Sequence, residues 1–280
     1  MGEHAGRYDW VAERLCDAGF EVFANDHRGH GRTATSPAEL GDMGANGWHR
    51  AVQDLREIID WIAGAYPGVA RVLLGHSMGS LLARQYLIDH GQTLDAAILS
   101  GSTDGGGFQL HLTRLLARVE RFRLGPRGES EIVQKALFGK SNRAFEPGRT
   151  GFEWLSRDPD QVDRYVEDPL CGFVLRMGSL CDMFDGLAKE RRRSERRKIP
   201  GELPIYIFSG DRDPIHRDLA GLRRLLNEYR AAGLQQVQHR FYEGGRHEMF
   251  NETNREEVCR DLIGWLAKSI PSSQPQESAR

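Results

Sequence analysis

The sequence predicts an α/β fold, in which a mostly parallel sheet carries helices on both faces. Short apolar runs alternate with segments of helical period along most of the chain, which is the pattern of strand–helix–strand units. The 280 residues are 39% hydrophobic and 28% charged, as in ordinary globular proteins, and suffice for one sizeable core. We therefore expect one domain with a single sheet.

The elements of this sheet follow from the hydrophobic period and from its breaks. Tyr8, Val11 and Leu15 share one face of a helix that Gly19 ends, and the apolar "FEVFAND" after it reads as a strand. The expected elements, in chain order, are a helix over 7–18, a strand over 20–26, a helix around 52–62, strands over 70–75 and 94–102, with a helix between these two, a strand over 203–210, a helix around 217–231, a strand over 237–245, and a last helix after 254.

A long segment between the strands over 94–102 and 203–210 breaks the alternation. Leu112, Leu115, Leu116 and Val119 form one helical stripe in it. We divide the chain into a core over 1–104, a helical insertion over 105–200, a second core part over 201–270, and a polar tail over 271–280 that we expect to be disordered.

The insertion ends in "KERRRSERRK", which holds seven basic and two acidic residues at 189–198. The first interpretation of this run is a solvated helix face or linker. A contact with an anionic membrane surface is a secondary interpretation, and a nuclear signal ranks below both.

Composition excludes several classes of protein. A formal charge of −2 argues against a nucleic-acid-binding protein, which needs a basic face. No apolar stretch is long enough to span a bilayer, and no signal peptide is visible. The four cysteines (Cys16, Cys171, Cys181, Cys259) are scattered without a CxxC pair, which is typical of reduced thiols. We therefore expect a cytoplasmic location.

Gly75-His76-Ser77-Met78-Gly79 fits the G-x-S-x-G pattern and lies between a predicted strand and a predicted helix. In such a turn the serine is held in a strained conformation, and the glycines avoid a collision where strand and helix meet. The sequence has no GxxxxGK[ST] or GxGxxG, so a phosphate loop is excluded. Ser77 is the candidate nucleophile; a glycine-rich turn with an incidental serine remains the alternative.

A nucleophilic serine needs a base. His247 lies in the glycine-rich "YEGGRHEMFNE" after the last strand, where a loop can reach over the sheet edge, and His216 is the second candidate. His76 next to Ser77 reads as a packing residue, and the other seven histidines as turn or surface residues. His247-Glu248 does not continue as H-E-x-x-H, so metal binding is disfavoured and no cofactor is expected.

The base needs an acid that orients it, and "SGDRDPIH" offers Asp211 and Asp213 directly after a strand. Asp211 can equally hold the turn through a hydrogen bond. With either aspartate, the chain order is Ser, then Asp, then His. This order is expected of an α/β-hydrolase and not of the other serine-hydrolase folds.

The motifs "MGEHAGRYDWVAERL", "DHRGHGRT", "GHSMGS", "SGDRDPI" and "GGRHEMFNE" resemble the monoacylglycerol lipase/lysophospholipase branch of the α/β-hydrolases, of serine aminopeptidase S33 type. "DPLCGF" in the insertion is also similar to that family. The resemblance implies an acid placed as G-x-x-D, which selects Asp213, and it assigns the base to His247 and the nucleophile to Ser77. It also implies that the insertion is a cap whose apolar face receives an acyl chain. A serine nucleophile speaks against epoxide hydrolases and haloalkane dehalogenases.

The chain departs from this family at its start. The family reads His-Gly-x-Gly-Glu-His here, and x donates one backbone amide of the oxyanion hole. Met1 occupies the x position, so the His-Gly and the strand before it are absent. The expected oxyanion donors are the amides of Met78 and Met1. We expect the natural protein to begin upstream, with a strand that lies between 20–26 and 70–75; the alternative is that these two strands pair directly.

The sequence thus predicts a serine carboxylester hydrolase, and the family resemblance implies that its substrates are monoacylglycerols or lysophospholipids. Alternatives are a short-chain esterase, a peptidase of proline-iminopeptidase type, or a catalytically impaired hydrolase-fold binding protein. The expected partner is a small acyl ester, and a peripheral membrane contact through the insertion is a further hypothesis. The sequence leaves the acyl-chain length, the head group and the oligomeric state open.

Overall fold

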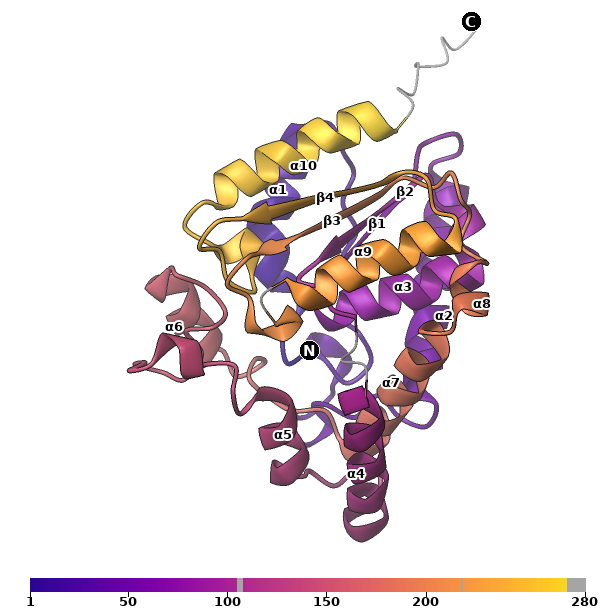
Figure 1. Cartoon of the computed structure of the whole chain (residues 1–280). Coiled ribbons are helices and arrows are strands. Elements are labelled where there is room, and N and C mark those ends of the chain that lie inside the picture. The colour runs from indigo at the N-terminus through magenta and orange to yellow at the C-terminus, as the bar shows by residue number, and fades with distance from the viewer. Residues whose placement is uncertain (105–107, 218, 271–280) are drawn as a thin grey trace, which may run out of the picture.

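The computed structural model describes residues 1–104, 108–217 and 219–270, and its centre is a four-stranded parallel sheet. The strands stand in chain order, β1 (Val72–His76), β2 (Ala96–Ser100), β3 (Ile205–Gly210) and β4 (Val237–Tyr242) (Figure 1). In the register, Gly75 of β1 is opposite Leu99 of β2, and Phe208 of β3 is opposite Arg240 of β4. The α/β class predicted from the alternation is confirmed.

Helices cover both faces of the sheet, as Figure 1 shows. On one face lie α2 (Gly47–Ala65), α3 (Met78–His90) and α9 (Ala220–Ala232), and on the other lie α1 (Asp9–Asp17) and α10 (Arg255–Ser269). Because successive strand residues point to opposite faces, Leu99 and Ile207 pack on the first side, whereas Ile98 and Phe208 pack on the second. Strands β2 and β3 are therefore buried between two apolar layers, whereas β4 is an edge strand with Gln238, His239 and Arg240 exposed.

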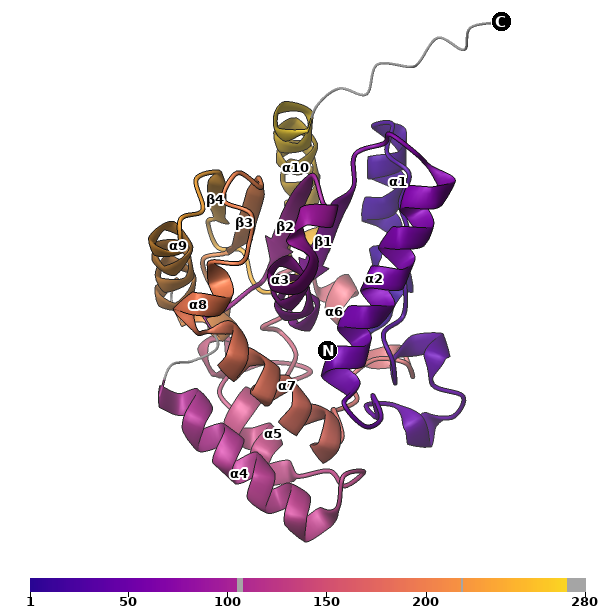
Figure 2. The ribbon, with the colours of Figure 1, turned by 90° about the vertical axis from the view of Figure 1, so that its right-hand side faces the viewer.

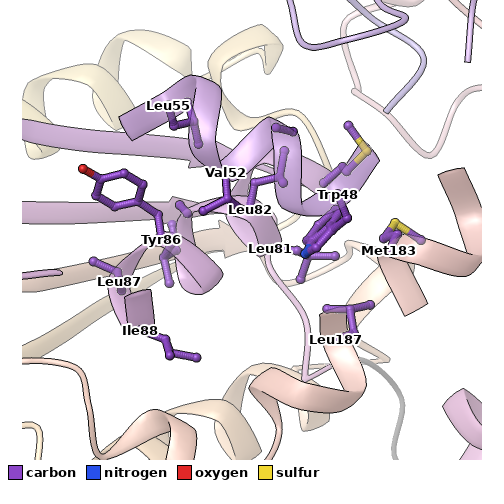
Figure 3. Close-up of a cluster of buried hydrophobic side chains, with 14 of the residues drawn as sticks. Trp48, Val52, Leu55, Leu81, Leu82, Tyr86, Leu87, Ile88, Met183 and Leu187 are labelled. Carbon is purple, nitrogen blue, oxygen red and sulfur yellow. The ribbon is translucent and has the colours of Figure 1, made fainter. Parts of the chain in front are cut away.

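The residues between β2 and β3 form a helical insertion that packs beside this core (Figure 2). Figure 3 shows how one of its helices is anchored: Met183 and Leu187 lie against Trp48 and Leu81, in the cluster that α2 and α3 share. The insertion's helices are α4 (Phe108–Leu124), α5 (Glu131–Phe138), α6 (Pro159–Glu167), α7 (Met177–Glu190) and α8 (Arg193–Arg196). Among the helices that the structure describes, none is both long and apolar enough to cross a membrane.

Single turns of 3-10 helix complete the secondary structure of the described residues. They are η1 (Ala5–Tyr8), η2 (Gly31–Thr33), η3 (Pro37–Glu39), η4 (Gly91–Thr93), η5 (Arg143–Phe145), η6 (Pro214–His216) and η7 (Met249–Asn251).

The strand predicted over 20–26 is wrong. These residues adopt no regular structure, and Phe23 is exposed, its ring lying against those of Trp61 and Tyr66 at centroid distances of 5.6 and 5.7 Å. An extended segment becomes a strand only where a neighbour accepts and donates its backbone hydrogen bonds. On the side of β1 away from β2 the described residues supply no such neighbour, so the alternative that 20–26 pairs directly with β1 is also wrong.

Most basic residues of the run over 189–198 are exposed, as the first interpretation expects, and Arg196 is the exception. Arg196 is buried and forms ion pairs with Glu190 (3.4 Å) and Glu228 (2.5 Å). Glu190 is in turn bound by Arg84 of α3, whose Nη2 lies 2.6 Å from Oε2. The sequence pattern assigns these charges to solvent because two of their partners lie on helices far away in the sequence. The predicted tail over 271–280 lies outside the described residues.

Candidate active site

Ser77 lies in the turn between β1 and α3 with φ 51° and ψ −118°, a backbone conformation that residues other than glycine seldom adopt. The Ser77 amide donates to the Ser100 carbonyl of β2 at 2.9 Å, which ties the turn to the sheet. A Cβ on Gly75 would lie 2.3 Å from the Gly79 carbonyl oxygen, so the first glycine is required for space. A Cβ on Gly79 would meet only His27 Nε2 at 4.0 Å, which corrects the expectation that both glycines prevent a collision.

The loop after β4 brings His247 over Ser77. His247 Nε2 lies 2.9 Å from Ser77 Oγ, and His247 Nδ1 lies 2.8 Å from Asp213 Oδ2. His247 and Asp213 are both buried, and Ser77 is half-buried. With the Nδ1 proton donated to the carboxylate, Nε2 is free to accept the Ser77 hydroxyl proton. The three residues predicted from separate strand ends thus form one hydrogen-bonded chain.

Asp213 is held from three directions in the loop after β3. Its Oδ1 accepts from the Ile215 amide at 2.9 Å, and its Oδ2 accepts from Ser209 Oγ at 3.2 Å as well as from His247. Burial raises the pKa of this carboxyl, but the charge and hydrogen bond of His247 more than offset burial, and the pKa stands below its usual range. Asp213 is therefore an ionised, oriented acceptor.

The pKa of His247 is shifted in the opposite direction to that of Asp213. Burial lowers the pKa of its imidazole, yet the charge of Asp213 and the hydrogen bond to it prevail, and the pKa is raised above its ordinary value. The ring is flanked by those of His76 and Trp154, with centroids 4.8 and 5.0 Å away. Gly101 makes room for the two histidines, because a Cβ there would lie 2.9 Å from His76 and 3.1 Å from His247.

The structure also separates the competing candidates. Asp211 accepts the Gly244 amide at 2.9 Å and so holds a turn. His216 is fully buried, with Nε2 donating to the Gly210 carbonyl (2.8 Å) and Nδ1 accepting from the Leu219 amide (2.9 Å). His76 is hydrogen-bonded to Ser100 Oγ at 3.1 Å. Both histidines thus hold structural hydrogen bonds, and His247 is the one whose described hydrogen bond reaches Ser77.

The two expected oxyanion donors lie in different settings. Met78 is the first residue of α3, where backbone amides have no partner inside the helix. The Met1–Gly2 segment is seated against the insertion, because the Gly172 amide donates to the Gly2 carbonyl at 3.0 Å. Burial lowers the pKa of His27 to about 4 and that of His30 to about 3. The donor role of Met1 stays a prediction.

One group of potential metal ligands occurs among the described residues, away from the predicted triad. Ligand atoms of His4, Asp168 and Cys171 lie within 4.8 Å of one another. The Gly6 amide donates to His4 Nδ1 at 3.2 Å, so that Nε2 carries the proton and donates to Asp168 at 2.8 Å. Burial raises the pKa of the Cys171 thiol to about 12. His4 and Asp168 therefore form a hydrogen bond that joins the N-terminal segment to the "DPLCGF" motif.

Sequence reasoning missed the residues that surround the loop of His247. Trp154 reads only as apolar mass in the sequence, Arg157 belongs to no motif there, and Glu252 ends the motif "GGRHEMFNE" without a role of its own. They meet because the insertion folds back onto the core, with Arg157 Nε 2.8 Å from Glu252 Oε2. Contacts between residues this distant in sequence leave no local pattern that could have revealed them.

Comparison with known proteins agrees with the geometry. The family model described as serine aminopeptidase S33 matches residues 1–254. The chain is 28% identical over 272 residues to a monoacylglycerol lipase of Mycolicibacterium smegmatis, covering 96% of this chain and 85% of that protein. It is 29% identical over 275 residues to the human monoglyceride lipase, covering 95% and 80%.

A solved structure extends the likeness to the fold. A thermostable carboxyl esterase from Bacillus coagulans, in complex with glycerol, superposes with a TM-score of 0.88 at 30% identity, over 97% of this chain and 88% of that one. The match includes both the sheet and the insertion, because it spans nearly the whole chain. The chain therefore belongs to the serine aminopeptidase S33 family of α/β-hydrolases, in its monoglyceride-lipase-like branch.

Proposed function

We propose that this α/β-hydrolase is a serine carboxylester hydrolase with Ser77 as nucleophile, His247 as general base and Asp213 as the residue that orients and stabilises the base. One observation carries the proposal: hydrogen bonds of 2.8 and 2.9 Å run from Asp213 through His247 to Ser77 Oγ. The strained backbone of Ser77 and the names of the similar proteins support it.

The mechanism follows from these positions. Ser77 Oγ attacks the ester carbonyl while His247 Nε2 takes its proton, and the imidazolium is stabilised by the Asp213 carboxylate. The Met78 amide and the backbone nitrogen of Met1 are the proposed donors to the oxyanion, each worth roughly 3–4 kcal/mol in the transition state. His247 then protonates the leaving alcohol, and a water deprotonated by the same nitrogen hydrolyses the acyl-enzyme.

The test is turnover of p-nitrophenyl esters by the purified protein, together with labelling by a fluorophosphonate probe. We expect both, with the label on Ser77. Absence of both would favour the alternative of a catalytically impaired binding protein, in which the oxyanion hole is incomplete.

For the substrate, we propose single-acyl lipids, namely monoacylglycerols or lysophospholipids. The relatives named monoacylglycerol or monoglyceride lipase support this choice. Each methylene buried under the insertion adds about 0.8 kcal/mol of binding, so rates should rise from acetyl toward medium or long acyl esters. A steady fall beyond butyrate would favour the short-chain esterase, and cleavage of prolyl anilides would favour the peptidase.

We further propose that the insertion is a cap that contacts membranes through α4. Its outer face carries Leu112, Leu115, Val119 and Phe122, all exposed, with Phe122 at 95% exposure. Their spacing places them on one side of the helix, while Leu110 and Ala117 are buried on the other. An exposed apolar stripe beside Arg118 and Arg123, which pair with Asp185 and Glu120 but stay 53% and 59% exposed, is suited to an anionic bilayer surface.

Vesicle co-sedimentation tests this contact. Leu115→Ser with Phe122→Ser should weaken binding to anionic phosphatidylglycerol vesicles. A matched control, Trp61→Ser, changes an exposed apolar residue on α2 and should leave binding unchanged. The cytoplasm is the proposed location, because Cys16, Cys171, Cys181 and Cys259 are all free thiols.

A further inference from the structure

We propose that residues 153–157 of the insertion position the loop that carries His247, with Arg157 and Glu252 as positioning residues. This inference rests on the proposed function, because it concerns the placement of the base. It means that the insertion, beyond any contact with substrate, decides whether His247 faces Ser77.

The first support is the backbone of the loop. Three successive amides are bound: Arg246 N donates to Glu252 Oε1 at 2.9 Å, His247 N to the Trp154 carbonyl at 3.3 Å, and Glu248 N to the Leu155 carbonyl at 2.8 Å. Two of the three acceptors thus belong to the insertion. The backbone from which the imidazole projects is therefore built partly on the insertion and only partly on the core.

The second support is Glu252, which is 1% exposed and whose carboxylate binds both the insertion and the loop of His247. Besides the Arg246 amide it accepts the Arg157 amide at 3.1 Å and Arg157 Nε at 2.8 Å. Arg157 Nη2 continues to Asn254 Oδ1 at 2.9 Å. A buried carboxylate that loses its cation is strongly destabilised, so Arg157 is held firmly in this place.

Further hydrogen bonds join residues 153–157 to residues 246–252, and we call this contact region the seam. Ser156 Oγ donates to the Asn251 carbonyl at 2.7 Å. In the other direction, Arg246 Nη1 donates to the Ser156 carbonyl at 2.9 Å and to the Glu153 carbonyl. Hydrogen bonds therefore run both ways between 153–157 and 246–252.

The consequence is mechanical coupling between the insertion and the base. If residues 153–157 move away, the backbone amides of His247 and Glu248 lose the carbonyl groups that accept their hydrogen bonds. The His247 ring also loses its contact with Trp154. A misplacement of about 1 Å in catalytic geometry costs up to roughly 100-fold in rate. We expect the binding of a small acetyl ester to depend little on these contacts. Loss of the contacts should therefore lower kcat and leave KM unchanged.

The experiment compares Arg157→Met with Arg149→Met in the full chain, using p-nitrophenyl acetate. Arg149 is the matched control, because it lies in the same insertion and its guanidinium pairs with Asp163 at 2.6 Å, outside the seam with the loop of His247. We expect kcat to fall roughly 10- to 100-fold for Arg157→Met at unchanged KM, and to stay within about twofold for Arg149→Met. Arg157→Lys keeps the charge beside Glu252 and should restore most of the rate.

A second readout does not need activity: the downfield proton resonance of His247 Nδ1–H, which should be present in the wild type and in Arg149→Met and lost in Arg157→Met. If Arg157→Met does not fold, Ser156→Ala, which removes the hydrogen bond to the Asn251 carbonyl, replaces it in both measurements. Equal kcat and an unchanged resonance in the Arg157 and Arg149 variants would overturn the inference while leaving the proposed function intact. A wild type without esterase activity and without fluorophosphonate labelling would refute the proposed function, and the resonance would still decide the positioning.

Discussion

Replacing Asp213 by asparagine tests the proposed mechanism at its most buried group. In the Asp213→Asn variant, the side-chain oxygen would stay toward the Ile215 amide, since that amide donates to Oδ1 at 2.9 Å in the native protein. The new NH2 group then stands at the Oδ2 position, where it faces His247 Nδ1 at 2.8 Å. Because two donors cannot share that contact, the imidazole adopts the other tautomer, with Nδ1 as acceptor and the Nε2 proton directed at Ser77. In that tautomer His247 is not a base.

The size of the loss follows from charge and tautomer together. A carboxylate about 4 Å from an imidazolium contributes about 4 kcal/mol at an effective dielectric constant of about 20. At about 1.4 kcal/mol per factor of ten, this alone is nearly a thousandfold in kcat. The wrong tautomer increases the loss, and we expect roughly 10⁴-fold in total.

The assay is kcat for p-nitrophenyl butyrate at saturating substrate, with Asp211→Asn as the matched control. Asp211 lies two residues away and only holds a turn through the Gly244 amide at 2.9 Å, which the asparagine oxygen still accepts. We expect the control to stay within about threefold of wild type, since a neutral hydrogen bond contributes only about 1 kcal/mol. Thermal melts should be recorded to check that both variants fold. Equal losses in the two variants, or a greater loss for Asp211→Asn, would refute the assignment of the acid.

Three other predictions concern the nucleophile, pH and stability. Ser77→Ala should abolish ester hydrolysis and fluorophosphonate labelling with an unchanged circular dichroism spectrum. Substantial turnover by the purified variant would show that Ser77 is not the nucleophile. Activity requires neutral His247, whose pKa is raised because the charge and hydrogen bond of Asp213 outweigh burial, so kcat/KM should fall as pH drops through a midpoint above 6.5. A midpoint below that value would contradict this electrostatic account. Arg84→Met leaves buried Glu190 with Arg196 at 3.4 Å as its remaining cation and should lower the free energy of unfolding in urea by about 3 kcal/mol, whereas Arg84→Met with Glu190→Met should recover part of it.

The candidate site could be predicted from the sequence where it depends on local structure. Gly75 and Ser77 occupy a strand–turn–helix junction whose strain arises within five residues, so the pattern makes Ser77 the candidate nucleophile, with an incidental serine as the alternative. Asp213 and His247 follow strands, and the carboxyl ends of parallel strands meet at one edge of a sheet, so their order along the chain predicts that they converge. The choice of Asp213 over Asp211 came from family resemblance, and the distances in the structure agree with it.

Local pattern was misleading where an element needs a partner. The apolar "FEVFAND" has the composition of a strand, but a strand exists only as part of a ladder, and the described residues leave 20–26 without one. The basic residues of 189–198 read as a solvated face and most of them are exposed, but Arg196 is buried against Glu190 and Glu228. In both cases the deciding interaction lies outside the window in which a sequence pattern is read.

The sequence by itself determined the α/β class, the turn that carries Ser77, and the order in which the proposed nucleophile, acid and base follow the strands. Hydrophobic period and turn chemistry are properties of neighbouring residues. Only the tertiary structure decided which strands pair, that Trp154 and His76 enclose the imidazole, and that Arg157 and Glu252 join the insertion to the loop of His247. These features depend on hydrogen bonds and ion pairs between segments that lie far apart in the sequence. Such partners are chosen by packing of the whole chain, and nothing in the spacing of either segment specifies the other.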